Sequence, residues 1–404
     1  MSEQCPHAAG SSPIPAAVTG FNLMDTTVHA NPYPTYEWLR EHAPVYKMPG
    51  VPMFVLSRHE DIKRVLRDQD GFASSLGMDV PLMSMVMKDG ADHTRLRQSI
   101  NRAFVPRNIQ HLAPRITAIA DDLLSRIAGP CEFVQALANP LPVTVICEML
   151  GVPLKYRDDM NRYARDALMA AFAATGMGSP QLRAEAETGL RALMAILDEA
   201  IELHRVTPQD NIISSLVEEE RRGTVTRDEL RHLCGVLLIA GHETTANLLA
   251  NGAYLLAGDP ALFDRLKAEP EAIPRFVEEL VRTRPPLQRV MRRATREVEI
   301  GGVMIPASSL VMLLPGSANR DAREWNDADG FDIDRDTHGH LGFGTGIHVC
   351  PGASLTRLEA RLTFEALFRR VRHIGLDPAK RATPIVGYGA GSLGWNRLPL
   401  IVEI

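Results

Sequence analysis

The sequence has few cysteines, and they do not form pairs. Its 404 residues include five, at positions 5, 131, 147, 234 and 350, and no two of them stand in a CxxC arrangement. This excludes a disulfide framework and a structural zinc site and agrees with a reducing cytoplasm. The first twenty residues also lack a basic stretch followed by an apolar run, so we expect neither a signal peptide nor a membrane anchor.

An excess of positive charge is missing as well. The chain has 44 basic and 49 acidic residues, a formal net charge of −5, which argues against a nucleic-acid-binding protein. No internal repeat or low-complexity tract is present. Hydrophobic residues make up 45% of the chain, enough for a large core, although the length alone would allow two or three domains.

The hydrophobic pattern predicts a helix-rich protein with little sheet. A strand is expected over Met53–Leu56, where four apolar residues follow one another. Helical spacing dominates from about residue 141 to residue 280, and short strand-like pieces return at 297–305 and 398–404.

The most informative segment is the glycine-rich loop 342–352. Its glycines allow the backbone to bend sharply and to lie close against a flat partner. Cys350 follows, and Pro351 suits the first turn of a helix. A sulfur at such a helix start faces free N–H groups, which lower the pKa of a thiol and favour a metal-binding thiolate. An ordinary hairpin with a buried cysteine is the alternative.

The pattern Phe-Gly-x-Gly-x-His-x-Cys-x-Gly at 343–352 resembles the haem-binding loop of the cytochrome P450 superfamily at every fixed position. The resemblance implies that Cys350 is the proximal ligand of a haem b iron, with Phe343 and Gly344 against the haem. Thiolate ligation favours O–O cleavage. The implied fold is mainly α with small β-sheets, the soluble bacterial-type cytochrome P450 fold. We expect a flexible segment over 1–20 and one triangular haem domain with a long central helix over 21–404.

That long helix is itself predicted from the residues. Thr226 and Glu229 form a capping-box pattern, apolar residues continue to Leu256, and Gly258-Asp259-Pro260 is a stop signal. Some thirty residues would span roughly 45 Å, the width of a whole domain.

Polar residues interrupt the middle of this helix at 240–245. A glycine and a carboxylate are unfavourable in a buried helix, and such breaches mark functional sites. A kink with Thr244 bonded back to the preceding turn is the alternative. The segment resembles the family's oxygen-binding groove, formed here by Ala240 and Gly241. By that resemblance Thr244 hydrogen-bonds dioxygen and Glu243 relays protons. His242 is interpreted as a structural hydrogen-bonding residue.

Two further sets of charged residues match the family's pattern. Glu279 and Arg282, at helical i, i+3 spacing, are implied to form a buried network with Arg335 that holds the haem loop. His93 and Arg97 share one helical face, which suits a carboxylate clamp for the haem propionates. The resemblance adds Arg292 and His348 to this clamp. The neighbouring Arg293 leaves the choice between the two arginines open, and a solvated basic run is the alternative.

The expected substrate pocket is apolar and largely aliphatic. Its candidate residues are Leu76, Met83, Met85, Val236, Ile239, Leu287 and Val290. They favour a hydrophobic small molecule such as a terpenoid, a steroid or a polyketide-like compound, although methionines at such spacing also fit plain core.

No flavin or iron–sulfur segment follows Cys350, so electrons are expected from a ferredoxin served by an NAD(P)H ferredoxin reductase. Arg102, Arg107, Arg357 and Arg361 are candidates for its docking patch, and unpartnered surface arginines are an equal alternative.

These patterns together predict an oxidoreductase, a cytoplasmic and monomeric monooxygenase that uses dioxygen to hydroxylate or epoxidise its substrate. Two alternatives stay open at this point. One is a haem-thiolate sensor or gas-binding protein without turnover, and the other is peroxide-driven use of the same fold.

Overall fold

The computed structural model describes residues 25–77, 80–83, 85–157, 159–160, 162–163, 166–167, 180–386 and 391–404. The segment 1–20, predicted to be flexible, lies outside the described residues. The helices are α1 Thr26–Ala30, α2 Tyr33–His42, α3 His59–Arg67, α4 Gly90–Asn101, α5 Pro106–His111, α6 Ala113–Ser125, α7 Pro140–Leu150, α9 Pro180–Val206, α10 Ile212–Arg221, α11 Arg227–Gly258, α12 Pro260–Ala268, α13 Ile273–Thr283, α14 Pro315–Ala318 and α15 Ala353–Arg370. The strands are β1 Val45–Lys47, β2 Met53–Leu56, β3 Phe72–Ala73, β4 Gly129–Glu132, β5 Val290–Ala294, β6 Val298–Ile300, β7 Val303–Ile305, β8 Leu310–Leu313, β9 His373–Leu376, β10 Thr383–Pro384, β11 Trp395–Arg397 and β12 Pro399–Glu403.

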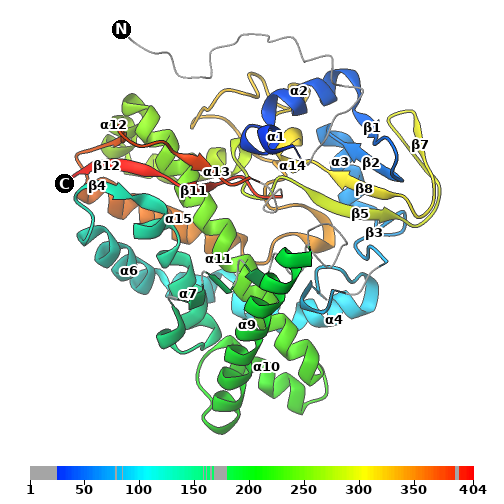
Figure 1. Ribbon diagram of the computed structural model, residues 1–404, viewed down its shortest axis with the longest axis horizontal. Coiled ribbons are helices and arrows are strands. Elements are labelled where there is room, and N and C mark those ends of the chain that lie inside the picture. Colours follow the sequence, from blue (N-terminus) through cyan, green and yellow to red (C-terminus); the bar gives the residue numbers. More distant parts are fainter. Residues whose placement is uncertain are drawn as a thin grey trace.

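The largest sheet has the strand order β1-β2-β8-β5-β3. β2 runs parallel to β8, with Met53 opposite Leu310, and β5 runs antiparallel to β8. β2 is the strand expected from its apolar run, and three of its four residues are buried. Helices α2 and α3 cover this sheet and share a second, smaller hydrophobic core with it. Figure 1 shows the sheet at one corner of the molecule, beside α1 and α2.

Helix α11 runs through the middle of the structure (Figure 1). It begins with the expected capping box. The Thr226 side chain accepts from the backbone N–H of Glu229 at 3.2 Å, and the Glu229 carboxylate accepts from the N–H of Thr226 at 2.9 Å. Its length and composition would also fit a membrane span, but 78% of its most apolar stretch is buried inside the protein, as in a core helix.

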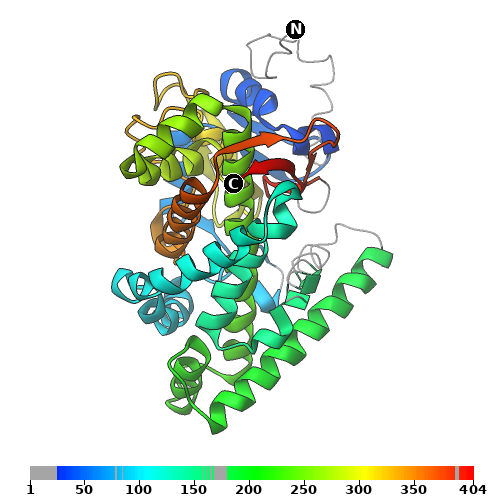
Figure 2. The same ribbon diagram turned by 90° about the vertical axis from the view of Figure 1, so that its left-hand side faces the viewer.

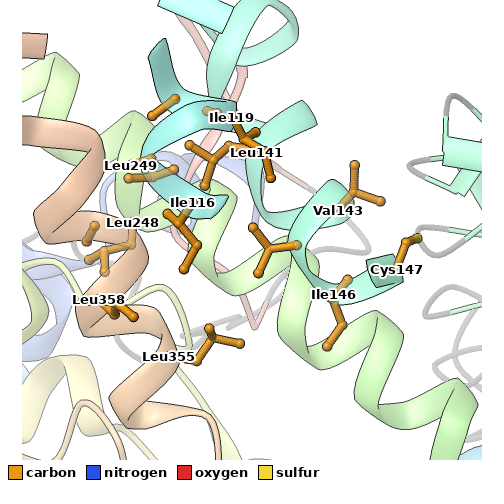
Figure 3. Close-up of a cluster of buried hydrophobic side chains, with 14 of the residues drawn as sticks. Ile116, Ile119, Leu141, Val143, Ile146, Cys147, Leu248, Leu249, Leu355 and Leu358 are labelled. Carbon is orange, nitrogen blue, oxygen red and sulfur yellow. The ribbon is translucent and has the colours of Figure 1, made fainter. Parts of the chain in front are cut away.

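The main core forms where α6, α7 and α15 pack around α11. Figure 3 shows Ile116 and Ile119 of α6, Ile146 of α7, Leu248 of α11 and Leu355 of α15 within this cluster. Figures 1 and 2 both place α9 and α10 at the end of the molecule away from the five-stranded sheet. The mainly helical fold with small sheets confirms the prediction. The packing holds α11 and α15 side by side, and each of these helices contributes to the site.

Candidate functional site

A cavity of about 210 Å³ lies between α11, the segment that joins α13 to β5, the glycine-rich loop and the start of α15. Its lining brings together eight residues that the sequence singles out: Thr244, Leu287, Val290, Arg292, Phe343, Gly344, His348 and Cys350. They come from three separate parts of the chain: α11, the segment 287–292 and the glycine-rich loop. The structure therefore places the cysteine loop and the polar interruption of the long helix at one site.

The glycine-rich loop folds back on itself to present Cys350. The N–H of Cys350 donates to the carbonyl of Phe343 at 2.9 Å. Gly346 has φ of +76°, and a Cβ there would lie 2.5 Å from the carbonyl oxygen of Leu66, so glycine is required at this position. Helix α15 begins at Ala353. Pro351 thus stands before the helix, which corrects the expectation that it occupies the first turn.

Cys350 lines the cavity, and burial raises the pKa of its thiol. The backbone N–H of Gly352 and the guanidinium of Arg97 act in the opposite direction but do not outweigh burial. The prediction of a lowered thiol pKa is therefore wrong for this protein without a bound metal. A metal that binds this sulfur has to displace its proton.

His348 is held by an acidic residue that the sequence analysis did not single out. Its Nε2 lies 3.1 Å from Asp89 Oδ1 and 2.8 Å from Ser74 Oγ, and its ring centroid is 4.2 Å from that of His93. Burial would raise the pKa of Asp89, but hydrogen bonds from His348 and Ser74 outweigh it and lower the pKa to about 2. Burial, with the neighbouring His348, lowers the pKa of His93 to about 4.

The two arginines of β5 differ in their surroundings. Arg292 is buried, lines the cavity and donates to the carbonyl of Met291 at 2.8 Å. Arg293 instead donates to the carbonyl of Ser75 at 3.1 Å. On α4, Arg97 donates to the carbonyl of Val349 at 2.7 Å, next to Cys350. Geometry thus favours Arg292 over Arg293 as a cation toward the cavity.

The residues present fit a haem. The lining holds one cysteine sulfur, aliphatic side chains and glycine backbone, and two residues that can face carboxylates, Arg292 and His348. Such a donor set matches a macrocycle with a thiolate-ligated iron and two carboxylates. Cys350 would hold the iron, and Arg97, Arg292, His93 and His348 would face the carboxylates.

The middle of α11 sends its polar side chains in different directions. Thr244 Oγ1 donates to the carbonyl of Ala240 at 2.8 Å, which is the bond to the preceding turn given above as the alternative for this residue. Thr244 also lines the cavity. A Cβ at Gly241 would lie 3.1 Å from Ile146, so glycine lets α7 approach closely. His242 is buried, and neither ring nitrogen has a hydrogen-bond partner among the described residues. The interpretation of His242 as a hydrogen-bonding residue is therefore wrong.

Another buried carboxyl group that the sequence did not indicate is Glu359, three residues after the cavity residue Thr356 on α15. Glu359 of α15 is 1% exposed, and neither carboxyl oxygen has a hydrogen-bond partner within the described part of the chain. Burial raises its pKa well above the ordinary value, although nearby Thr245 acts in the opposite direction. Thr245 Oγ1 lies 3.2 Å from Thr356 Oγ1, and Thr356 lines the cavity. The helical spacing of Glu359 gives no sign of this burial.

Glu279, Arg282 and Arg335 meet behind the loop. Arg282 forms two hydrogen bonds of 2.7 Å with the carboxylate of Glu279, and both side chains are fully buried. Arg335 Nε lies 3.3 Å from Glu279 Oε1. A Cβ at Gly342 would lie 2.8 Å from the carbonyl oxygen of Val281 in the same helix. Helix α13, which carries Glu279 and Arg282, is thus in direct packing contact with the glycine-rich loop.

Other predicted residues lie outside the cavity lining. Of the expected substrate residues, Leu76, Met83, Met85, Val236 and Ile239 are not among the described residues that line it. Val236 and Ile239 are buried in the main core. In the expected docking patch, Arg357 pairs with Glu278 and Arg361 with Glu365. Arg102 and Arg107 are exposed and have no ion pair with any described residue.

Comparisons with known proteins find relatives over most of the chain. A family model described as Cytochrome P450 matches residues 11–382. The chain is 32% identical to 6-deoxyerythronolide B hydroxylase of Saccharopolyspora erythraea, over 94% of this chain and 96% of that protein. It is 37% identical to vitamin D(3) 25-hydroxylase of Pseudonocardia autotrophica, over 86% and 88%. The crystal structure of CYP109E1 from Bacillus megaterium in complex with testosterone matches with a TM-score of 0.86 and 30% identity, over 94% of this chain and 100% of that one.

Proposed function

The chain belongs to the cytochrome P450 family of haem-dependent monooxygenases, and we propose that it hydroxylates or epoxidises a hydrophobic small molecule with dioxygen and electrons from a separate ferredoxin. The observation that carries this proposal is the placement of Cys350 and Thr244 on the lining of one cavity. A sulfur ligand and a hydroxyl group from a different helix then face the same small volume.

Haem b bound through Cys350 would supply the activation of dioxygen, which no side chain can provide. The protein contributes proton handling and exclusion of water. Because the Thr244 hydroxyl proton is engaged with the carbonyl of Ala240, its oxygen lone pairs remain to accept a hydrogen bond within the cavity. Thr244 thereby holds a protonated ligand or a water in place, and Glu243, one residue earlier, relays protons from outside the cavity.

The lining supports a hydrophobic substrate. Three aliphatic residues form the apolar wall of the cavity: Leu248, Leu287 and Val290. The guanidinium of Arg292 is already hydrogen-bonded to a backbone carbonyl, so the lining does not call for a charged substrate. The relatives are named for 6-deoxyerythronolide B and vitamin D(3), and the structural neighbour binds testosterone. A steroid, terpenoid or polyketide-like molecule is therefore the proposed substrate class.

For the redox partner we propose a ferredoxin, reduced by an NAD(P)H ferredoxin reductase. Arg102 and Arg107 are exposed and unpaired among the described residues, so they can meet acidic groups of a partner. Arg357 and Arg361 already pair within the chain, which makes them weaker candidates. The proposed setting is a monomer in the cytoplasm.

The first test is the carbon monoxide difference spectrum of the dithionite-reduced protein. A strongly red-shifted Soret band is expected for the native protein, and its loss is expected in Cys350→Ser. A band at the position typical of imidazole ligation would contradict the assignment of Cys350.

The second test is Thr244→Ala in a reconstituted ferredoxin system. We expect haem to be retained while the product formed per NAD(P)H falls by about 100-fold or more and hydrogen peroxide rises, because proton transfer by a positioned group contributes at least about this factor. Thr188→Ala is the matched control, since Thr188 makes the same i−4 bond to Ala184 outside the cavity. If the native protein turns over only with added peroxide, the peroxide-driven alternative is correct. If the native protein shows no turnover with any oxidant, the sensor alternative is correct.

A further inference from the structure

A polar stripe runs along α11 on the face that meets the C-terminal turn 391–394. Glu243, Asn247 and Asn251 are four residues apart, so they share one side of the helix. Ser392 Oγ donates to Glu243 Oε1 at 3.3 Å, and Asn251 Nδ2 donates to the carbonyl of Leu393 at 3.1 Å.

Asn247, between these two contacts, also packs against the turn. A Cβ at Gly394 would lie only 2.1 Å from Asn247 Oδ1. The turn therefore fits the whole stripe closely, and only glycine is accommodated at its end.

The same turn is tied to the wall of the cavity. The N–H of Leu393 donates to the carbonyl of Pro286 at 2.7 Å, and the N–H of Gln288 donates to the carbonyl of Gly391 at 2.6 Å. Leu287, between these two bonds, pairs with Ser392 in an isolated β-bridge and lines the cavity. Ser392 thus lies between a wall residue of the cavity and the carboxylate of Glu243.

We propose that Ser392 is a positioning residue, which fixes the Glu243 carboxylate beside Thr244 and makes its position depend on how a substrate lies against Leu287. This inference rests on the proposed function, in which Glu243 relays protons. The two backbone hydrogen bonds do not involve the Ser392 side chain, so the turn itself is expected to survive loss of the hydroxyl.

The first experiment follows the δ-carbon of Glu243 by ¹³C NMR in the carbon monoxide complex of the reduced, haem-containing protein, which is diamagnetic. The resonance is assigned by its loss in Glu243→Gln. We expect it to move in Ser392→Ala and to return in Ser392→Thr, which restores the hydroxyl. Testosterone, as a hydrophobic probe, is expected to shift the resonance in the native protein and not in Ser392→Ala. This readout requires no turnover.

The second experiment measures product formed per NAD(P)H with testosterone in the ferredoxin system. Loss of one hydrogen bond predicts a roughly fivefold fall in Ser392→Ala, recovery in Ser392→Thr and an unchanged dissociation constant for testosterone. A Glu243 resonance that does not move in Ser392→Ala would overturn the inference. So would a fall in the product formed per NAD(P)H, here called coupling, that Ser392→Thr does not restore. If Glu243→Gln leaves coupling unchanged, the proton relay of the proposed function fails, whereas the resonance still decides the contact.

Discussion

Replacing Arg282 tests how strongly the buried network behind the loop stabilises the fold. Arg282 and Glu279 are both 0% exposed. Besides its two bonds to Glu279, Arg282 donates to the carbonyls of Asn319, Ala328 and Gly330 at 2.7, 2.8 and 3.0 Å. The guanidinium therefore satisfies five acceptor contacts with no access to water.

The size of the effect follows from what the substitution would leave behind. In Arg282→Met, Glu279 would keep only the Arg335 contact at 3.3 Å and the N–H of Asp332 at 3.0 Å. Breaking one side of a buried ion pair costs about 3–5 kcal/mol. Each buried carbonyl that loses its donor adds about 1–3 kcal/mol, although these costs do not simply add. We expect a total of at least about 5 kcal/mol, which approaches the whole stability of an ordinary domain.

Since Arg282→Met is expected to leave little folded protein, Arg282→Lys is the quantitative variant. Lysine keeps the charge but cannot reproduce the planar fork, so we expect a loss of about 2–4 kcal/mol in the free energy of unfolding. Urea unfolding followed by circular dichroism measures it, and the haem content per chain is expected to fall as well. The control is Arg115→Ala, which removes an exposed bidentate pair with Glu148 and should cost less than about 1 kcal/mol. If Arg282→Lys is no less stable than this control, the reasoning is refuted.

Two further predictions concern the core around α11. Burial raises the pKa of Glu359 in the folded protein, so its carboxyl group stays neutral there at a pH at which the unfolded chain already ionises. The free energy of unfolding therefore falls as the pH rises from about 4.5, the ordinary pKa of Glu, toward the raised pKa of the folded state. Glu359→Gln should therefore gain stability over the native protein with rising pH in urea unfolding, and parallel pH profiles would contradict this. A Cβ at Gly252 would lie 2.4 Å from the ring of Phe364, so Gly252→Ala should lose about 1–3 kcal/mol. A Cβ at Gly258 would have no neighbouring atom within 4 Å, so Gly258→Ala should instead increase the free energy of unfolding by about 0.5 kcal/mol. Equal effects of the two substitutions would contradict the packing argument.

The elements that the sequence predicted well depend on local signals. The capping box at Thr226 and Glu229 and the stop before Pro260 place both ends of α11, because caps act within one turn of the backbone. β2 coincides with the predicted strand Met53–Leu56, since an apolar run of this length fits a strand buried on both faces. The cysteine loop was identified by the resemblance of its residue pattern at 343–352 to the haem-binding loop of the cytochrome P450 family. These signals need no knowledge of the rest of the chain.

The features that the sequence could not predict are contacts between distant segments. Asp89 meets His348 across 259 positions, and Ser392 meets Glu243 across 149. Neither residue type nor spacing marks such pairs. The pKa of the Cys350 thiol was also mispredicted because of distant segments. The local helix start favours a low thiol pKa, but burial by the surrounding fold outweighs this effect.

The run 242–245 shows why a polar cluster in a helix is not one functional unit. Successive residues of an α-helix point about 100° apart, so four neighbouring side chains must face four directions. Only Thr244 lines the cavity, whereas Thr245 turns toward Thr356 and His242 toward the apolar core. Glu243 faces a further direction, toward the C-terminal turn 391–394. Ser392 of this turn donates to Glu243, so one contact of the polar run comes from a segment 149 residues further along the chain.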